Sequence, residues 1–231
     1  MISYFQPAYW RAAFRDPLTL LAIAVDVIPV IFVVFFGWGA EALVLLYWAE
    51  NLLIGVATLV RMFLSGLQTL GVFGLFVGTF MTVFFTFHYG LFCFGHGVFL
   101  FEFARSVDLP AGSMAPSPDT MWQMFHAVRL SWPGMGTGLM LILAYQLAAA
   151  IADYWPGKAQ AIPSLQEEMF APYGRIVVLH IGIFAGAAAL IALGDPMIGV
   201  LLLIVLRIGF SIVGRSWRDS RRENIQEKTE G

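Results

Sequence analysis

The chain of 231 residues is poor in charge, since only 12% of its residues are Asp, Glu, Lys or Arg. Soluble domains carry about 25% of these residues, so a water-soluble globule is excluded. Intrinsic disorder is excluded as well, because disordered chains are polar and poor in aromatic residues, whereas 15% of this chain is Phe, Trp or Tyr. The net charge of −2 gives no support to nucleic-acid binding.

Cysteine and the common catalytic motifs are also missing. The single cysteine, Cys93, excludes an internal disulfide framework and a cysteine-based zinc cluster. The sequence contains no His-Glu-x-x-His motif, no Gly-x-Ser-x-Gly motif, no phosphate-binding loop and no dinucleotide fingerprint. These absences argue against soluble-type zinc proteases, serine hydrolases and ATP-driven pumps. They do not exclude membrane proteins whose functional residues come from separate helices.

Long apolar runs, in contrast, are abundant. A helix needs about 20 apolar residues to cross a bilayer, and backbone polar groups in lipid must be satisfied within the helix. The sequence therefore predicts an all-α polytopic membrane protein with six transmembrane helices. Run 71–104 is counted as one span, because two halves of about 15 residues would each be too short. The six runs are residues 18–38, 40–64, 71–104, 134–155, 172–193 and 196–214.

The distribution of positive charge orients these spans. With both termini in the cytoplasm, most of the 13 Lys and Arg residues lie in cytoplasmic segments, and the outer loops hold only Arg105 and Arg129. We therefore expect a multi-pass protein of the inner (cytoplasmic) membrane with the lipid bilayer as its partner. The expected parts are an interfacial segment at 1–17, the transmembrane domain at 18–214 and a charged tail at 215–231.

Two short helices are expected outside the spans. In the outer loop 105–133, Ser117 and Pro118 have the residue types of an N-cap and a first helical position. They precede an amphipathic pattern, which predicts a short helix at the outer surface. On the cytoplasmic side, Ser164 and Glu167 have the spacing of a capping box.

Each predicted span also carries a strongly polar residue near its middle, where an ionisable group costs at least about 2.5–3.5 kcal/mol. At about 1.5 Å per residue, His88 falls at the centre of its span, His96 about 12 Å further out, and His180 about 4 to 5 Å on the inner side of its own midpoint. We expect these polar groups to converge on one interior cluster. Its other members are Asp26, Glu50, Asn51, Gln146 and Arg207.

Part of this cluster has the composition of a metal site. Glu50, His88 and His180 form a carboxylate–imidazole set suited to zinc or another divalent transition metal, and His96 is a candidate fourth ligand. A bis-histidine haem on His88 and His180 is a further alternative.

If the cluster is catalytic, its carboxylates have a role of their own. Glu50 and Asp26 would then handle protons in a metal-dependent reaction on a lipid or another membrane-embedded substrate. Asn51, Tyr89 and Arg207 are the candidate binding residues. Whether the protein is an enzyme stays open.

Two other functions fit the same residues. In a small transporter or proton relay, Glu50 and the histidines would titrate during transport. In a non-catalytic scaffold, Glu50 would instead form an ion pair with Arg207, and the histidines would only hydrogen-bond between helices.

Two strings, YWAENLLIG at 47–55 and HYGLF at 88–92 followed by His96-Gly97, carry a family resemblance. Together they resemble an uncharacterised family of bacterial integral-membrane proteins, known only as a domain of unknown function. The resemblance covers nearly the whole chain. It implies a polytopic membrane fold and no established activity.

Overall fold

The computed structural model describes residues 17–103, 116–154, 163–174, 176–177, 180–181, 192, 205 and 209. In these ranges, helices are the regular secondary structure and strands are absent, which confirms the all-α prediction. The helices are α2 (Pro17–Phe36), α3 (Ala40–Phe103), α4 (Pro118–Ser131), α5 (Met135–Tyr154) and α6 (Leu165–Phe170).

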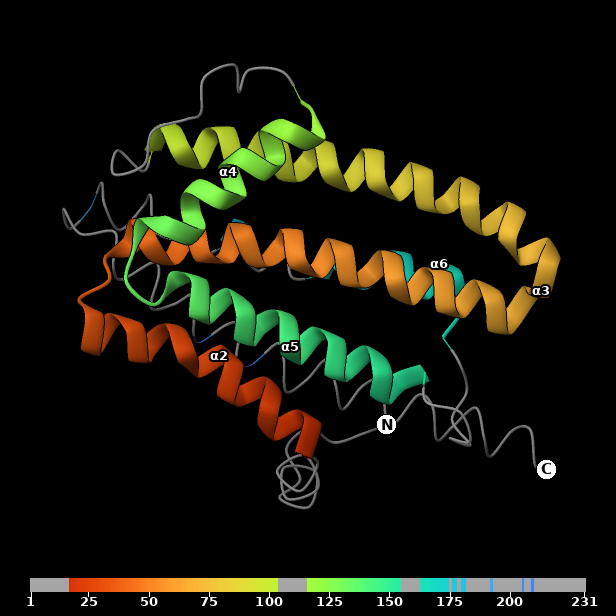
Figure 1. Ribbon diagram of the computed structural model, residues 1–231, viewed down its shortest axis with the longest axis horizontal. Coiled ribbons are helices and arrows are strands. Elements are labelled where there is room, and N and C mark those ends of the chain that lie inside the picture. The colour runs from red at the N-terminus through yellow and green to blue at the C-terminus, as the bar shows by residue number, and fades with distance from the viewer. Residues whose placement is uncertain are drawn as a thin grey trace.

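Helix α3 folds back on itself as two arms (Figure 1). We call Ala40–Gln68 the first arm and Phe76–Phe101 the second arm. Trp48 of the first arm donates a hydrogen bond of 2.8 Å to the carbonyl oxygen of Cys93 in the second arm. A straight helix would separate these residues by about 67 Å at 1.5 Å per residue, so the chain reverses direction between the arms.

Within the described residues, three segments are long and apolar enough to cross a membrane: the first arm, the second arm and α5. They correspond to the predicted spans 40–64, 71–104 and 134–155. The first predicted span corresponds to α2, whose apolar part, Leu20–Phe36, is shorter. The count of six spans and their orientation stay predictions, because several predicted segments lie wholly or mostly outside the described residues. These segments are 1–17, 172–193, 196–214 and 215–231.

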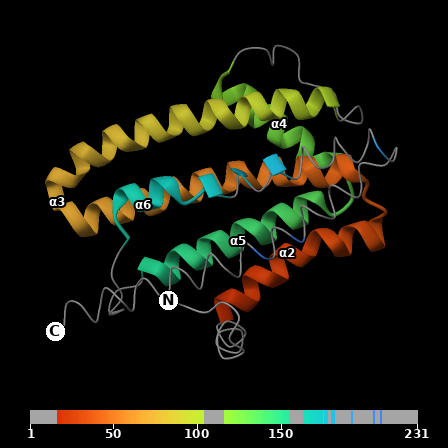
Figure 2. The same cartoon turned by 180° about the vertical axis from the view of Figure 1, so that it is seen from behind.

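The long helices lie side by side in the order second arm, first arm, α5, α2 (Figures 1 and 2). α3 packs against α4, α5 and α6, and α5 also packs against α2 and α4. The main apolar core fills the space between these helices, and it is densest along the first arm. Its most buried members include Leu43, Leu46, Trp48, Met124 and Met135.

Both short helices begin where the sequence predicted. Ser117 caps α4 by accepting a hydrogen bond of 3.1 Å from the backbone N–H of Thr120, and Pro118 is the first helical residue. In α6, Ser164 accepts from the N–H of Glu167 at 3.3 Å, and the Glu167 carboxylate accepts from the N–H of Ser164 at 2.9 Å. These side chains satisfy backbone N–H groups that have no partner within the helix.

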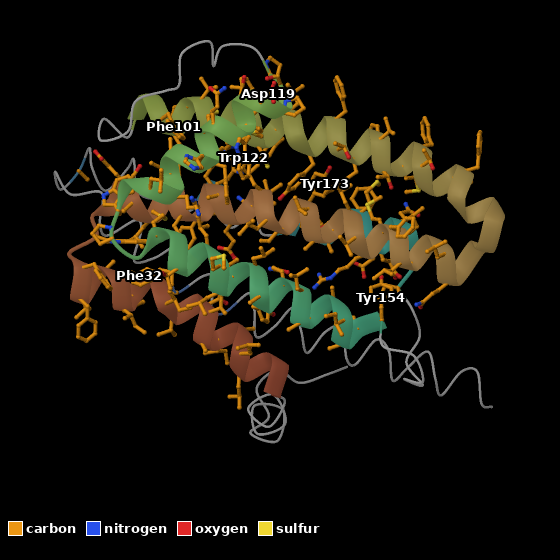
Figure 3. The ribbon with its side chains drawn as sticks, viewed as in Figure 1. Phe32, Phe101, Asp119, Trp122, Tyr154 and Tyr173 are labelled. Atoms are coloured by element: carbon orange, nitrogen blue, oxygen red, sulfur yellow. The ribbon has the colours of Figure 1, made fainter. Side chains whose placement is uncertain are left out.

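α6 is tied to the long helices by buried polar contacts as well as by apolar packing. Ser65 of the first arm donates to the carbonyl oxygen of Pro163 at 2.6 Å, just before α6 begins. Tyr154, at the end of α5 (Figure 3), donates to the Glu168 carboxylate of α6 at 3.0 Å. A second apolar cluster packs α6 against both arms; its members are Met62, Phe85, Tyr89, Cys93, Leu165, Met169 and Ile176.

Candidate functional site

The predicted carboxylates lie inside the protein. Glu50 on the first arm is 2% exposed and Asp26 on α2 is 3% exposed, and neither group is without a partner. Gln146 on α5 is also buried. These polar groups therefore lie away from the surface, and their convergence on one cluster stays a prediction. Arg207, the predicted ion-pair partner of Glu50, lies outside the described residues.

Asn51 and Tyr89, both predicted as binding residues, contact each other. The Tyr89 hydroxyl donates a hydrogen bond of 3.0 Å to the backbone carbonyl oxygen of Asn51, and both residues are buried. The Tyr89 ring also lies directly against Gly55, where an added Cβ would be 2.7 Å from the ring atom Cε1. The two residues therefore hold the arms together.

A second contact of this kind lies about two turns further along the second arm. The Trp48 indole donates its N–H to the Cys93 carbonyl oxygen and lies against Gly97. A Cβ at position 97 would be 2.8 Å from the indole and 2.7 Å from the Met124 side chain, so only glycine leaves room for this packing. The strings at 47–55 and 88–97 thus pack against each other and build the hairpin. Sequence reasoning missed this role for Trp48, Gly55 and Gly97.

Two predicted metal ligands, His96 and His180, do meet. Their Nε2 atoms are 3.0 Å apart, and the rings are nearly perpendicular at a centroid distance of 4.7 Å. His96 belongs to the second arm, and His180 belongs to a later helical stretch that includes 176–177 and 180–181. The pair is half-buried, and the ring of Phe92 packs against both imidazoles at 4.1 and 5.6 Å.

The remaining ring nitrogens fix the protonation pattern of this pair. Nδ1 of His96 is 3.0 Å from the carbonyl oxygen of Phe92, and Nδ1 of His180 is 2.8 Å from that of Ile176. A carbonyl oxygen only accepts, so each Nδ1 carries the hydrogen and donates it. A neutral imidazole has one N–H, which leaves both Nε2 atoms as acceptors that face each other. A hydrogen bond between them requires a third proton, and the fully bonded pair then carries one positive charge.

His88 lies apart from this pair. It is exposed, its ring stacks on Phe84 at 5.6 Å, and its other ring contact is with Tyr173 at 6.1 Å. No group of three or more His, Cys, Asp or Glu side chains with the spacing of a metal site occurs among the described residues. The structure therefore does not bring Glu50, His88 and His180 into one set of ligands, although all three are described.

The depth estimate for His180 was wrong. The midpoints of the apolar runs place it near the level of His88, but the structure places it against His96, about 12 Å further along the second arm. The midpoint of an apolar run does not fix how far one helix is shifted along its neighbour. Packing of Phe92, His96 and Tyr173 sets that shift here.

Sequence reasoning also missed Tyr173, whose ring contacts His88 and Tyr89 on the second arm. In Figure 3 it lies in the space between the two arms. A signal was present in the spacing. Tyr173 and His180 are seven residues apart and His88 and His96 are eight, so the two pairs span similar lengths of about 10.5 and 12 Å at 1.5 Å per residue. Two helices running in parallel with this spacing match the contacts that the structure shows.

The part of the chain that the structure describes is all-α and includes three helices long and apolar enough to cross a bilayer, which are features of a helical membrane protein. The chain belongs to a family of unknown function, DUF6498, whose model matches residues 8–230. The expected membership of an uncharacterised family is thereby confirmed. Comparisons with curated proteins and with solved structures give no match.

Proposed function

We propose that the chain is a multi-pass protein of the inner membrane, with six spans and cytoplasmic termini, that binds and releases a proton at the His96–His180 pair. It would act as a proton relay or as a small proton-coupled transporter. The single observation that carries this proposal is the facing of the two Nε2 atoms at 3.0 Å while both Nδ1 atoms donate to carbonyl oxygens.

The distances support a proton at this position. N–H···N and N–H···O hydrogen bonds have similar lengths, about 2.7–3.2 Å between heavy atoms, and 3.0 Å falls in this range. Without the third proton, the two nitrogen lone pairs oppose each other at 3.0 Å, and a proton shared between them removes this repulsion, whereas partial burial works against the positive charge. Histidine is also the side chain whose ordinary pKa lies closest to neutral pH, so the proton can leave again.

The location supports transport of that proton toward one membrane surface. His96 is about 7–8 Å from the end of the apolar stretch Phe76–Phe101, at 1.5 Å per residue. The pair therefore lies between the middle of the bilayer and its surface. The exposed His88 lies at the middle of the same arm.

The test is proton flux into proteoliposomes that contain the full chain, followed with an entrapped pH-sensitive dye under an imposed potential. We expect His96→Gln and His180→Gln each to reduce the flux at least tenfold. The double variant should be no worse than either single variant, because both remove the same shared proton. His126→Gln on α4 is the matched control and should leave the flux unchanged. Equal flux in all variants would overturn the proposal.

A transition-metal site is the second candidate, and one observation favours it. Histidines that bind metals usually donate their other ring N–H to a carbonyl or carboxylate, as His96 and His180 do. If an ion lay about 2.0–2.1 Å from each Nε2, the 3.0 Å separation of the two nitrogens would make the Nε2–ion–Nε2 angle about 95°. That angle suits the tetragonal sites of copper or nickel better than tetrahedral zinc.

This second candidate requires further ligands, which water or a substrate would supply. Coordination positions that the protein leaves open are typical of catalytic metal sites rather than structural ones. The second candidate is therefore compatible with an enzyme that acts on a membrane-embedded substrate. The test is elemental analysis of protein purified without chelator. Stoichiometric metal that is lost in His96→Gln and retained in His126→Gln would support the metal site, whereas metal-free protein with full proton flux would exclude it.

A further inference from the structure

The second feature that calls for a ligand is the exposed imidazole of His88. His88 lies at the centre of the apolar stretch Phe76–Phe101, about 18–20 Å from either end at 1.5 Å per residue. Polar residues at this depth nearly always face the protein interior or a partner, because lipid offers no hydrogen bonds. Here the residue is exposed, although it lies at this depth.

The ring nitrogens of His88 differ from those of the other two histidines. His96 and His180 each donate Nδ1–H to the carbonyl oxygen four residues earlier. The His88 ring instead lies flat on the ring of Phe84, four residues earlier, with an interplanar angle of 6°. Among the described residues its contacts are with aromatic rings, which leaves one N–H donor and one nitrogen acceptor for a ligand.

Aromatic rings from two distant parts of the chain form a connected cluster with this imidazole. Phe84 comes from the second arm and is 51% exposed; Phe170 ends α6 and is 55% exposed. Tyr173 links them, with ring centroids 6.1 Å from His88 and 5.9 Å from Phe170. Sites for small ligands are typically apolar and aromatic with a few polar groups that fix orientation, and this cluster has that composition.

The depth restricts the chemistry of the ligand. The hydrocarbon core is about 30 Å thick, so a phospholipid head group lies about 15 Å from His88. The ring contacts place Tyr173 and Phe170 within this core as well, deeper than the predicted start of the span 172–193. A water-soluble ligand does not approach from the lipid side. The ligand must dissolve in the bilayer, present a flat face to the rings, and carry a carbonyl or hydroxyl group for the imidazole.

We propose that Phe84, His88, Phe170 and Tyr173 form a lateral site, open to the bilayer, for a lipophilic molecule with a quinone-type head group. A quinone or quinol ring is flat, is soluble in lipid, and carries oxygen atoms that accept or donate a hydrogen bond at its edge. The site is independent of the proposed proton function, because none of its four residues belongs to the His96–His180 pair.

The experiment uses the full chain in nanodiscs of synthetic phosphatidylcholine, which contain no quinone. Equilibrium binding of a short-chain ubiquinone analogue is measured, and an azido derivative of the same analogue is photo-crosslinked and mapped by mass spectrometry. We expect saturable binding that weakens at least tenfold in His88→Leu, and adducts in the segments 84–91 and 170–173. His126→Leu, which removes a histidine from α4, should bind like the wild type.

Several outcomes would overturn the proposal. Equal binding by the wild type and His88→Leu, or adducts spread over the exposed apolar surface, would show nonspecific partition into lipid. Efficient disulfide crosslinking of His88→Cys between two chains would show that a second copy covers the imidazole instead. His96→Gln should reduce proton flux at least tenfold and leave quinone binding intact, so failure of one proposal is distinguishable from failure of the other.

Discussion

The two arms of α3 have similar apolar composition and opposite environments. In the first arm, 67% of the most apolar stretch is buried within the protein, whereas in the second arm the share is 17%. The first arm lies between the second arm and α5 (Figure 1), so it is covered on two sides. The second arm lies at the edge of the layer and has one inner face and one outer face.

This difference shows which residues of the hairpin carry stability and which are available for function. The inner face of the second arm, with Tyr89, Cys93 and Gly97, is fitted to the first arm through Trp48 and Asn51. The outer face is mainly phenylalanine and has His88 at its edge. An edge helix of this kind can bind a second element, such as the stretch that holds His180, without disturbing the core.

Among the contacts between the arms, removal of Trp48 should have the largest effect on stability. Its side chain is 1% exposed and its N–H is hydrogen-bonded across the hairpin. We expect Trp48→Ala to lower the free energy of unfolding by about 3–5 kcal/mol, measured by denaturant titration in detergent micelles. Trp122→Ala is the control, since Trp122 on α4 is 64% exposed (Figure 3). A similar loss in both variants would contradict the assignment of Trp48 as the link between the arms.

Gly97→Ala should have a smaller effect through the same contact. The added methyl group would overlap the Trp48 indole and the Met124 side chain, and overpacking of this kind costs about 1–3 kcal/mol. Gly95→Ala, two residues away, has nothing within 4 Å of the added Cβ. The control should therefore be neutral or slightly stabilising, since alanine favours helix over glycine by about 1 kcal/mol. The melting temperatures of Gly97→Ala and Gly95→Ala are measured by thermal unfolding under identical conditions. Equal melting temperatures would contradict the close packing inferred at Gly97.

Tyr89→Phe should weaken the hairpin only slightly. It removes the hydrogen bond to the Asn51 carbonyl oxygen and keeps the ring against Gly55. The expected loss is about 0.5–1.5 kcal/mol, measured by the same denaturant titration. Thr86→Ala is the control, because the Thr86 hydroxyl donates within its own arm, to the Thr82 carbonyl oxygen. A loss in Thr86→Ala as large as in Tyr89→Phe would show that the bond between the arms adds no stability.

The elements of the fold were predictable wherever a short-range rule applies. Helix N-termini at Ser117 and Ser164 follow from local capping chemistry, and the apolar runs mark the two arms and α5 by length alone. The pairing of His96 with His180 was not predictable in the same way. It depends on how far one helix slides along another, and that shift is set by side-chain packing between distant segments.

The candidate site, too, could be predicted from the sequence only in part. The sequence singled out His88, His96 and His180 because polar groups in apolar runs are costly wherever they lie. Their grouping with Glu50 was an inference from depth, and depth does not determine direction around the helix axis. The tautomers of the pair, on which its chemistry depends, follow only from the carbonyl oxygens of Phe92 and Ile176.

Substitution on the outer face of the second arm should have the smallest effect. Phe87 is 77% exposed, so Phe87→Ala leaves no cavity and should change the free energy of unfolding by no more than about 0.5 kcal/mol. Phe85, two residues earlier, is 1% exposed and stacks on Tyr89 at 4.8 Å, so Phe85→Ala should lose about 3–5 kcal/mol. Denaturant titration at two protein concentrations measures both variants. A large, concentration-dependent loss in Phe87→Ala would mean that this face is covered by another chain, and the second arm would then be as buried as the first.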